Sequence, residues 1–165
     1  MGFQPTLHGL KTRATQMRRF LIDTDTASDD AVALIMALRA PEVRVEAITV
    51  VRGNVPLQQA TENALYTVEL CGADVPVFMG EERPLRREPA HADWFHGADG
   101  FGNHHFPAAK MRPQKAHAVD AIIRVIHANS GIELVTLGPL TLRTVRSLSA
   151  TNRLPLPSFT CPPVA

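Results

Sequence analysis

Four aspartates, Asp23, Asp25, Asp29 and Asp30, lie within eight residues near the start of the chain. Apolar residues come directly before this group, at 20–22, and directly after it, at 31–38. Carboxylates held on one tight turn repel each other, and folding alone gives no reason to gather them there. A divalent cation would offset the repulsion, because hard cations take carboxylate oxygens as ligands. We therefore expect a metal or catalytic site at this turn.

Helix capping is the alternative explanation for the same residues. Ser28 or Asp29 could cap the N-terminus of the following helix, and acidic residues are favoured in the first helical turn. Capping accounts for Asp29 and Asp30, but not for Asp23 and Asp25, which close the preceding strand. The metal or catalytic interpretation is favoured for that reason.

A second candidate is His96, in a predicted loop at residues 80–116 that is rich in Pro, Gly and His. Loops of this length inside a compact domain are often functional, and glycines beside His96 would allow the loop to close over a site. The segment contains no zinc-binding spacing. Because a lone histidine is more often a surface or turn residue, spacing alone leaves both roles open for His96.

The apolar pattern predicts the elements that position these residues. The predicted strands are 18–23, 43–51, 75–79 and 132–137, and the predicted helices are 29–39, 56–71 and 117–129. Alternating strands and helices predict an α/β fold, with a mostly parallel, Rossmann-like sheet and helices on both faces. Ligands bind beyond the carboxyl ends of such strands, so the aspartates, Asn54 and Leu137 are expected to converge.

The composition and charge of the chain favour some classes of protein and argue against others. The chain has 165 residues, of which 45% are apolar and 20% charged, as expected for one soluble globular domain. Between residues 20 and 141 there are 16 acidic and 10 basic residues, and this acidic body argues against a nucleic-acid surface. No apolar run is long enough to span a membrane. The two cysteines match no disulfide or metal spacing, so a cytoplasmic protein is expected.

Four sequence elements resemble the nucleoside hydrolases, the inosine–uridine preferring N-ribosyl hydrolases. They are DTDTASDDAVAL at 23–34, VRGN at 51–54, HGADG at 96–100 and LGPLT at 137–141. They occur in the family's order, and the resemblance covers roughly residues 18–141. It implies Ca²⁺-dependent hydrolysis of the N-glycosidic bond of ribonucleosides, with ribose and a free base as products, in purine or pyrimidine salvage. It also implies a small-molecule nucleoside as partner and a homo-oligomer.

The resemblance implies roles for the residues around a metal. Asp25 and Asp30 match family Ca²⁺ ligands, and Leu137 matches a position that coordinates through its backbone carbonyl. Asp25 also matches the base that activates the attacking water, and Asp23 matches an aspartate that supports the cluster. The chemistry agrees, because cleavage of an N-riboside passes through an oxocarbenium-like sugar and needs a positioned water and a proton acceptor.

The resemblance also implies substrate contacts. Asp29 and Asn54 match residues that hold the ribose hydroxyls, and His96 matches a histidine near the nucleobase. The chain departs from the family where Thr26-Ala27 replaces the usual Pro-Gly of the turn. Alanine is disfavoured at positive φ, so a different turn shape is expected there.

The two ends of the chain carry separate expectations. Residues 1–17 are expected to be a disordered extension, 18–141 the N-terminal part of a nucleoside hydrolase domain, and 142–165 an aberrant or disordered tail. The tail has no acidic residue and no clear period, which predicts a frameshift or truncation near residue 142. The alternative functions are therefore an inactive truncated remnant or a non-catalytic subunit.

A third alternative is a haloacid-dehalogenase-like phosphatase, because a strand followed by Asp23-x-Asp25 resembles the nucleophile pair of that family. The phosphatases have Thr or Val where this chain has Ala27. Their pattern also leaves Asp29, Asp30 and the HGADG element without explanation.

Overall fold

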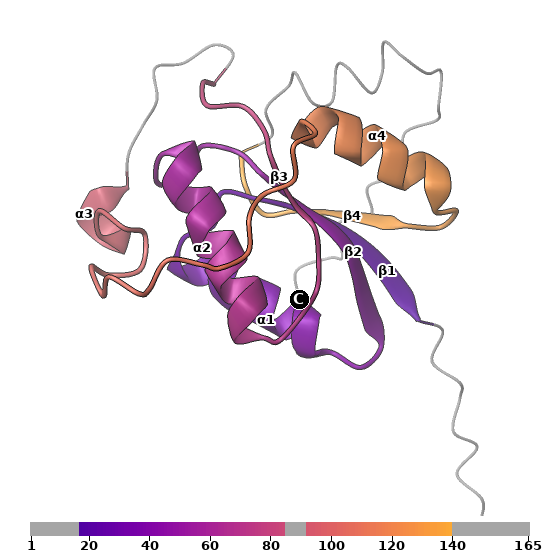
Figure 1. The fold of residues 1–165 in the computed structure, drawn as a ribbon, viewed down its shortest axis with the longest axis horizontal. Coiled ribbons are helices and arrows are strands. Elements are labelled where there is room, and N and C mark those ends of the chain that lie inside the picture. The colour runs from indigo at the N-terminus through magenta and orange to yellow at the C-terminus, as the bar shows by residue number, and fades with distance from the viewer. Residues whose placement is uncertain (1–16, 85–91, 140–165) are drawn as a thin grey trace, which may run out of the picture.

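The computed structural model describes residues 17–84 and 92–139, which form a four-stranded sheet flanked by helices (Figure 1). All strand pairs are parallel, and the strand order is β3-β2-β1-β4. The strands are β1 (Arg18–Thr24), β2 (Val43–Val50), β3 (Val77–Met79) and β4 (Glu133–Thr136). The predicted α/β fold with a parallel sheet is confirmed.

Helices pack on both faces of this sheet, as predicted (Figure 1). α1 and α2 cover one face and α4 covers the other. The helices are α1 (Ser28–Arg39), α2 (Leu57–Leu70), α3 (Asp93–His96) and α4 (Ala118–Ala128). α3 lies inside the segment predicted to be a loop, and that prediction was wrong at these four residues. A single helical turn is too short to show the 3.6-residue period from which helices are predicted.

Neighbouring residues of β1 show why the middle of this strand, residues 20–22, is an unbroken apolar run. Ile22 packs in the cluster beneath α1 and α2, together with Leu34 and Leu65. Leu21, one position earlier, packs on the opposite face against Ile122 of α4. Successive strand residues point to opposite faces, so a strand covered on both sides needs apolar residues at consecutive positions. These two apolar clusters fix the helices on both faces of the sheet. The parallel pairing of the strands places their carboxyl ends at the same edge of the sheet.

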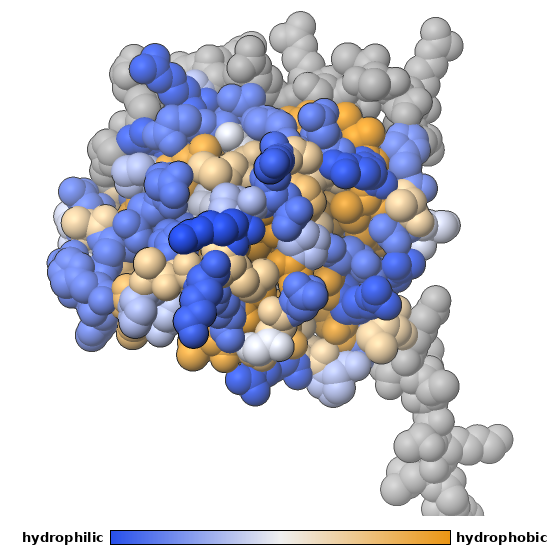
Figure 2. All heavy atoms as spheres, viewed as in Figure 1, coloured by the Kyte–Doolittle hydropathy of each residue, from blue (hydrophilic) through white to orange (hydrophobic). Residues whose placement is uncertain are grey.

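The predicted boundaries differ from the observed ones mainly at β3, which begins at Val77, two residues after the predicted start. Residues 1–16 and 140–165 lie outside the described residues, so the predicted extension and tail stay predictions. Within the described part of the chain, none of the helices combines the length and the apolar character that a membrane span requires. Figure 2 shows hydrophilic side chains over much of one face, with hydrophobic residues between them near α4 and the strands.

Candidate active site

Asp25 directly follows β1 and is 5% exposed. Its Oδ2 accepts a hydrogen bond of 2.8 Å from the backbone N–H of Asn54, which lies beyond the end of β2. A Cβ atom at Gly53 would lie 1.9 Å from this Oδ2, and one at Gly138 would lie 2.8 Å from the Asp25 backbone nitrogen. Both neighbouring strand ends therefore carry glycine where a side chain would collide with Asp25.

The end of β4 is held against the same turn. The backbone N–H of Leu137 donates to the carbonyl oxygen of Asp23 at 2.8 Å. The segments that carry Asp25, Asn54 and Leu137 thus meet at one edge of the sheet, as the topology predicted. We call residues 23–30 the aspartate turn.

Asp30 lies in the first turn of α1 and is 8% exposed. Its Oδ2 accepts hydrogen bonds from the Thr24 hydroxyl at 2.6 Å and from the backbone N–H of Asp25 at 3.2 Å. The helix N-cap is Ala27, and no side chain caps this end. The capping explanation for Ser28 or Asp29 was therefore wrong. The φ of Ala27 is −113°, so alanine is accommodated without a left-handed conformation.

Burial and mutual repulsion perturb two of the carboxyls. Burial raises the pKa of Asp25 to about 6; the hydrogen bond from Asn54 opposes this shift, and the charge of Asp30 adds to it. Burial likewise raises the pKa of Asp23 to about 6. A 2.6 Å hydrogen bond from the Thr49 hydroxyl opposes this shift. Both acids are thus held in surroundings that disfavour negative charge.

These surroundings fit part of a cation site. Among residues 17–84 and 92–139, no lysine or arginine forms an ion pair with Asp23, Asp25 or Asp30. Buried charges are ordinarily paired or bound to a metal. The same described residues contain no group of three or more His, Cys, Asp or Glu side chains arranged to hold a metal. Asp25 and Asp30 thus bring two buried carboxylates to one turn, without a third such side chain in this part of the chain that would complete a metal-binding group.

His96, at the end of α3, reaches the aspartate turn from the long loop. It is 7% exposed, and its Nδ1 lies 3.0 Å from the hydroxyl oxygen of Ser28. The Phe95 ring packs edge-on against it, with 4.8 Å between ring centroids. Asp29 is exposed in the first turn of α1. The structure thus joins His96 to the aspartate turn through Ser28, which the sequence suggested only as a helix cap.

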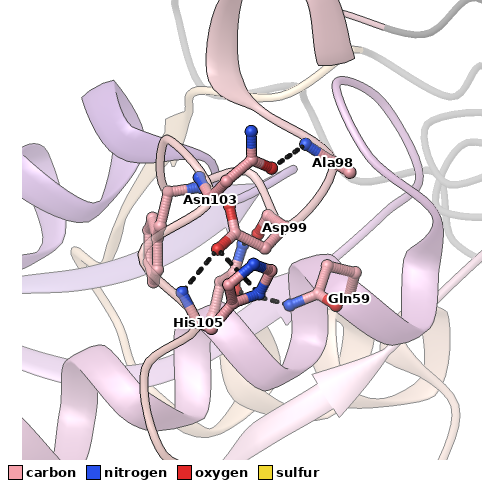
Figure 3. Close-up of polar contacts among 7 residues, drawn as sticks. Gln59, Ala98, Asp99, Asn103 and His105 are labelled. Carbon is pink, nitrogen blue, oxygen red and sulfur yellow. Dashed lines mark hydrogen bonds and ion pairs between the residues drawn. The ribbon is translucent and has the colours of Figure 1, made fainter.

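The loop that follows α3 is organised by a carboxylate (Figure 3). The Asp99 carboxylate accepts backbone N–H bonds from Phe101 and Asn103 at 2.8 Å and from His105 at 3.0 Å. Burial acts to raise the pKa of Asp99, but these three bonds outweigh it and lower the pKa below its usual range. We call residues 96–105 the histidine loop.

Sequence reasoning missed several polar residues that hold this site. Thr24 and Thr49 bond to its aspartates from within apolar strands, and Asn63 interrupts the apolar face of α2 between Ala60 and Ala64. For Asn63 the sequence did contain a signal, because the helical period predicts that this position is buried. A polar residue at a buried position needs hydrogen-bond partners.

A family model described as inosine-uridine preferring nucleoside hydrolase matches residues 20–142. The chain belongs to the nucleoside hydrolase family. The probable uridine nucleosidase 1 of Oryza sativa subsp. japonica is 37% identical over 126 residues, which are 74% of this chain and 39% of that protein. The pyrimidine-specific ribonucleoside hydrolase RihA of Photobacterium profundum is 38% identical over 138 residues, 82% of this chain and 44% of that protein.

Solved nucleoside hydrolase structures share the fold of this family member. The plant nucleoside hydrolase PpNRh1 superposes with a TM-score of 0.75 at 37% identity, over 82% of this chain and 43% of that one. An inosine-guanosine nucleoside hydrolase gives a TM-score of 0.73 at 38% identity, with the same shares of the two chains. The chain thus spans about two fifths of the length of these relatives. Family membership also sets aside the haloacid-dehalogenase alternative.

Proposed function

We propose that this chain carries the site of a Ca²⁺-dependent nucleoside hydrolase, which cleaves the N-glycosidic bond of ribonucleosides to ribose and a free base. The observation that supports it most strongly is a pair of buried carboxylates, Asp25 directly after β1 and Asp30 in the first turn of α1. Neither forms an ion pair with a basic residue in the described part of the chain. Ligands of open α/β sheets bind at this edge. Membership of the nucleoside hydrolase family supports the reaction class.

The metal ligands in this proposal are the carboxylates of Asp25 and Asp30 and the backbone carbonyl of Leu137. Calcium bound there would supply positive charge that acidifies water and orients hydroxyl groups. The Asp25 carboxylate would accept the proton from the attacking water. In the metal-free protein burial raises the pKa of Asp25 to about 6, so this carboxylate is more basic than an ordinary aspartate, which supports its role as proton acceptor. Asp23 would support the cluster from beneath.

The sugar and the base would lie on the open side of the aspartate turn. Asp29 and Asn54 would hold the ribose hydroxyls. The exposure of Asp29 and the backbone bond of Asn54 to Asp25 support this part of the proposal. Negative carboxylates near the sugar favour the positive charge that develops as the N-glycosidic bond breaks. His96, bonded to Ser28, would face the base as it leaves.

The proposed substrate class is a ribonucleoside, without assignment of the base. The relatives' names include uridine nucleosidase, pyrimidine-specific hydrolase and inosine-guanosine hydrolase, which differ in the base. A cytoplasmic location and a homo-oligomeric state remain predictions.

The test is ribose release from uridine, cytidine, inosine and guanosine, with Ca²⁺ or with a chelator. We expect release that requires Ca²⁺, is lost in Asp25→Ala, and persists in Asp74→Ala, which removes an exposed carboxylate after α2. Release that is insensitive to chelator or to Asp25→Ala would contradict the proposed site. Binding of Ca²⁺ without ribose release would contradict the proposed catalysis and support the non-catalytic alternative.

A further inference from the structure

Asn63 is a buried amide in the middle of α2, with 3% of its surface exposed. Its Nδ2 donates to the carbonyl oxygen of Thr26 at 3.0 Å and to the carbonyl oxygen of Asp99 at 2.9 Å. Its Oδ1 accepts a 2.9 Å hydrogen bond from Gln59 Nε2, one helical turn earlier. Both amide hydrogens and the amide oxygen therefore have partners.

This network fixes which end of the amide faces the two carbonyls. With the amide reversed, its oxygen would face the carbonyl oxygens of Thr26 and Asp99, and neither contact would have a hydrogen to share. Gln59 reinforces the observed orientation by donating to the other end of the group. Gln59 and Asp99 are both labelled in Figure 3, where the glutamine side chain on α2 extends beneath the loop.

The two carbonyls belong to different halves of the candidate site. Thr26 lies in the aspartate turn, and its hydroxyl is 3.0 Å from that of Thr24, which in turn donates to Asp30. Asp99 lies in the histidine loop and organises its backbone. Asn63 thus connects the segment that carries the carboxylates to the segment that carries His96, from beneath the site.

Gly100, which follows Asp99, leaves room for the hydrogen bond between Asn63 and the Asp99 carbonyl. A Cβ at Gly100 would lie 2.8 Å from Asn63 Nδ2, and its φ of 75° is in the left-handed region. Glycine is suited to both conditions, because it has no Cβ and tolerates positive φ. The loop can therefore approach the amide closely enough to bond to it.

We propose that Asn63 is a positioning residue that holds the aspartate turn and the histidine loop at a fixed separation, and so places His96 against Ser28. We call the two hydrogen bonds from Asn63 Nδ2 the bridge. The bridge joins two loops through a helix side chain and includes no hydrogen bond of the sheet. The inference rests on the proposed function only for the roles of Asp25, Asp30 and His96.

The test is amide hydrogen exchange on the full chain, with Asn63→Asp, Asn63→Ser and a control, Thr61→Val. Aspartate keeps the shape but offers no hydrogen to either carbonyl, and serine is too short to reach them. The control removes a buried hydroxyl of the same helix whose bond, to the Leu57 carbonyl, stays within α2. Both Asn63 variants are expected to exchange about tenfold faster at protected amides of both loops. The control and α4 should be unchanged.

The ¹⁵N NMR signals of the His96 ring give a second readout, because loss of the bridge should release Nδ1 from Ser28 and change its shift. Unchanged exchange in either loop, or equal acceleration in α4, would overturn the inference. So would an unchanged His96 signal in both Asn63 variants. Neither readout needs a substrate, so an absence of nucleoside hydrolysis would count against the proposed function and leave the bridge testable.

Discussion

The backbone N–H of Asn54 donates to the Asp25 Oδ2 at 2.8 Å, across 29 positions of sequence. This bond ties the loop after β2 to the carboxylate that follows β1. The Asp25 carboxylate therefore has one oxygen bonded to the backbone, inside a setting where burial and Asp30 both raise its pKa. A group so placed is restrained in position and poorly solvated when charged.

Asp25→Asn should stabilise the protein when no cation is present. The amide keeps an oxygen that can accept from Asn54, but it removes a buried charge beside Asp30. We expect the free energy of unfolding to rise by about 1–2 kcal/mol at neutral pH. Urea denaturation in the presence of chelator measures it, with Asp74→Asn as the exposed control. Clear destabilisation of Asp25→Asn alone would argue against a destabilising charge at this position.

The stability of the metal-free protein should fall as pH rises from about 5 to about 7. The pKa values of Asp23 and Asp25 are raised to about 6 in the folded state, from an ordinary 3.8. The folded protein therefore binds more protons than the unfolded chain in this window, and stability is lost as the pH rises through the folded pKa. Thermal unfolding at several pH values, with chelator, measures the slope.

Calcium should reverse this pH dependence. A cation bound at the aspartate turn favours the charged form of Asp25, so protons compete with it and its binding weakens below about pH 6. The double variant Asp23→Asn/Asp25→Asn should show a flattened slope with or without Ca²⁺. A slope that rises with pH in the metal-free wild-type protein would be inconsistent with the raised pKa values.

Thr49→Val should destabilise the fold through Asp23. The threonine hydroxyl donates a 2.6 Å hydrogen bond to the Asp23 Oδ1, and both residues are buried. Loss of this donor leaves a buried acceptor unpaired, which costs about 1–3 kcal/mol. Thr67→Val is the matched control, because the Thr67 hydroxyl donates to the Asn63 carbonyl within the same helix. Equal losses in the two variants would show that the Asp23 contact has no special weight.

Ser28→Ala should release His96 without unfolding the chain. Ser28 is exposed, and its hydroxyl is 3.0 Å from His96 Nδ1. If His96 acts in hydrolysis, loss of this hydrogen bond should lower kcat by about three- to tenfold. Steady-state rates measure the effect, and Ser130→Ala, at an exposed position after α4, is the control. An unchanged kcat in Ser28→Ala would remove this contact from the proposed mechanism.

The convergence of Asp25, Asn54 and Leu137 was predictable, because parallel strands place their carboxyl ends at one edge of the sheet. The sequence also identified the strands and longer helices through continuous apolar runs and the helical period. It did not reveal α3, which is one turn long, or the bridge of Asn63. That bridge joins Thr26 and Asp99, 37 and 36 positions away from Asn63. Contacts so distant depend on the packing of α2 against both loops, which no local pattern encodes.

The sequence predicted that the aspartate turn would differ from the family's usual turn, but it did not predict the backbone conformation of that turn. The substitution of Ala27 for the usual glycine suggested a different turn, and the observed φ of −113° shows that no left-handed residue is needed there. Residue type also allowed Ser28 to cap the N-terminus of α1, the alternative to a metal or catalytic site. Instead the Ser28 hydroxyl lies 3.0 Å from the Nδ1 of His96, a residue 68 positions further along the chain.

The most direct measurement is a calorimetric titration of the protein with Ca²⁺, in parallel with Asp25→Asn and Asp74→Asn. If Asp25 and Asp30 form part of a cation site, the wild-type protein and Asp74→Asn will bind Ca²⁺ alike. Asp25→Asn will then bind it at least about tenfold more weakly, because it loses a charged oxygen ligand. Equal Ca²⁺ affinity in Asp25→Asn and the wild-type protein would contradict the proposed site.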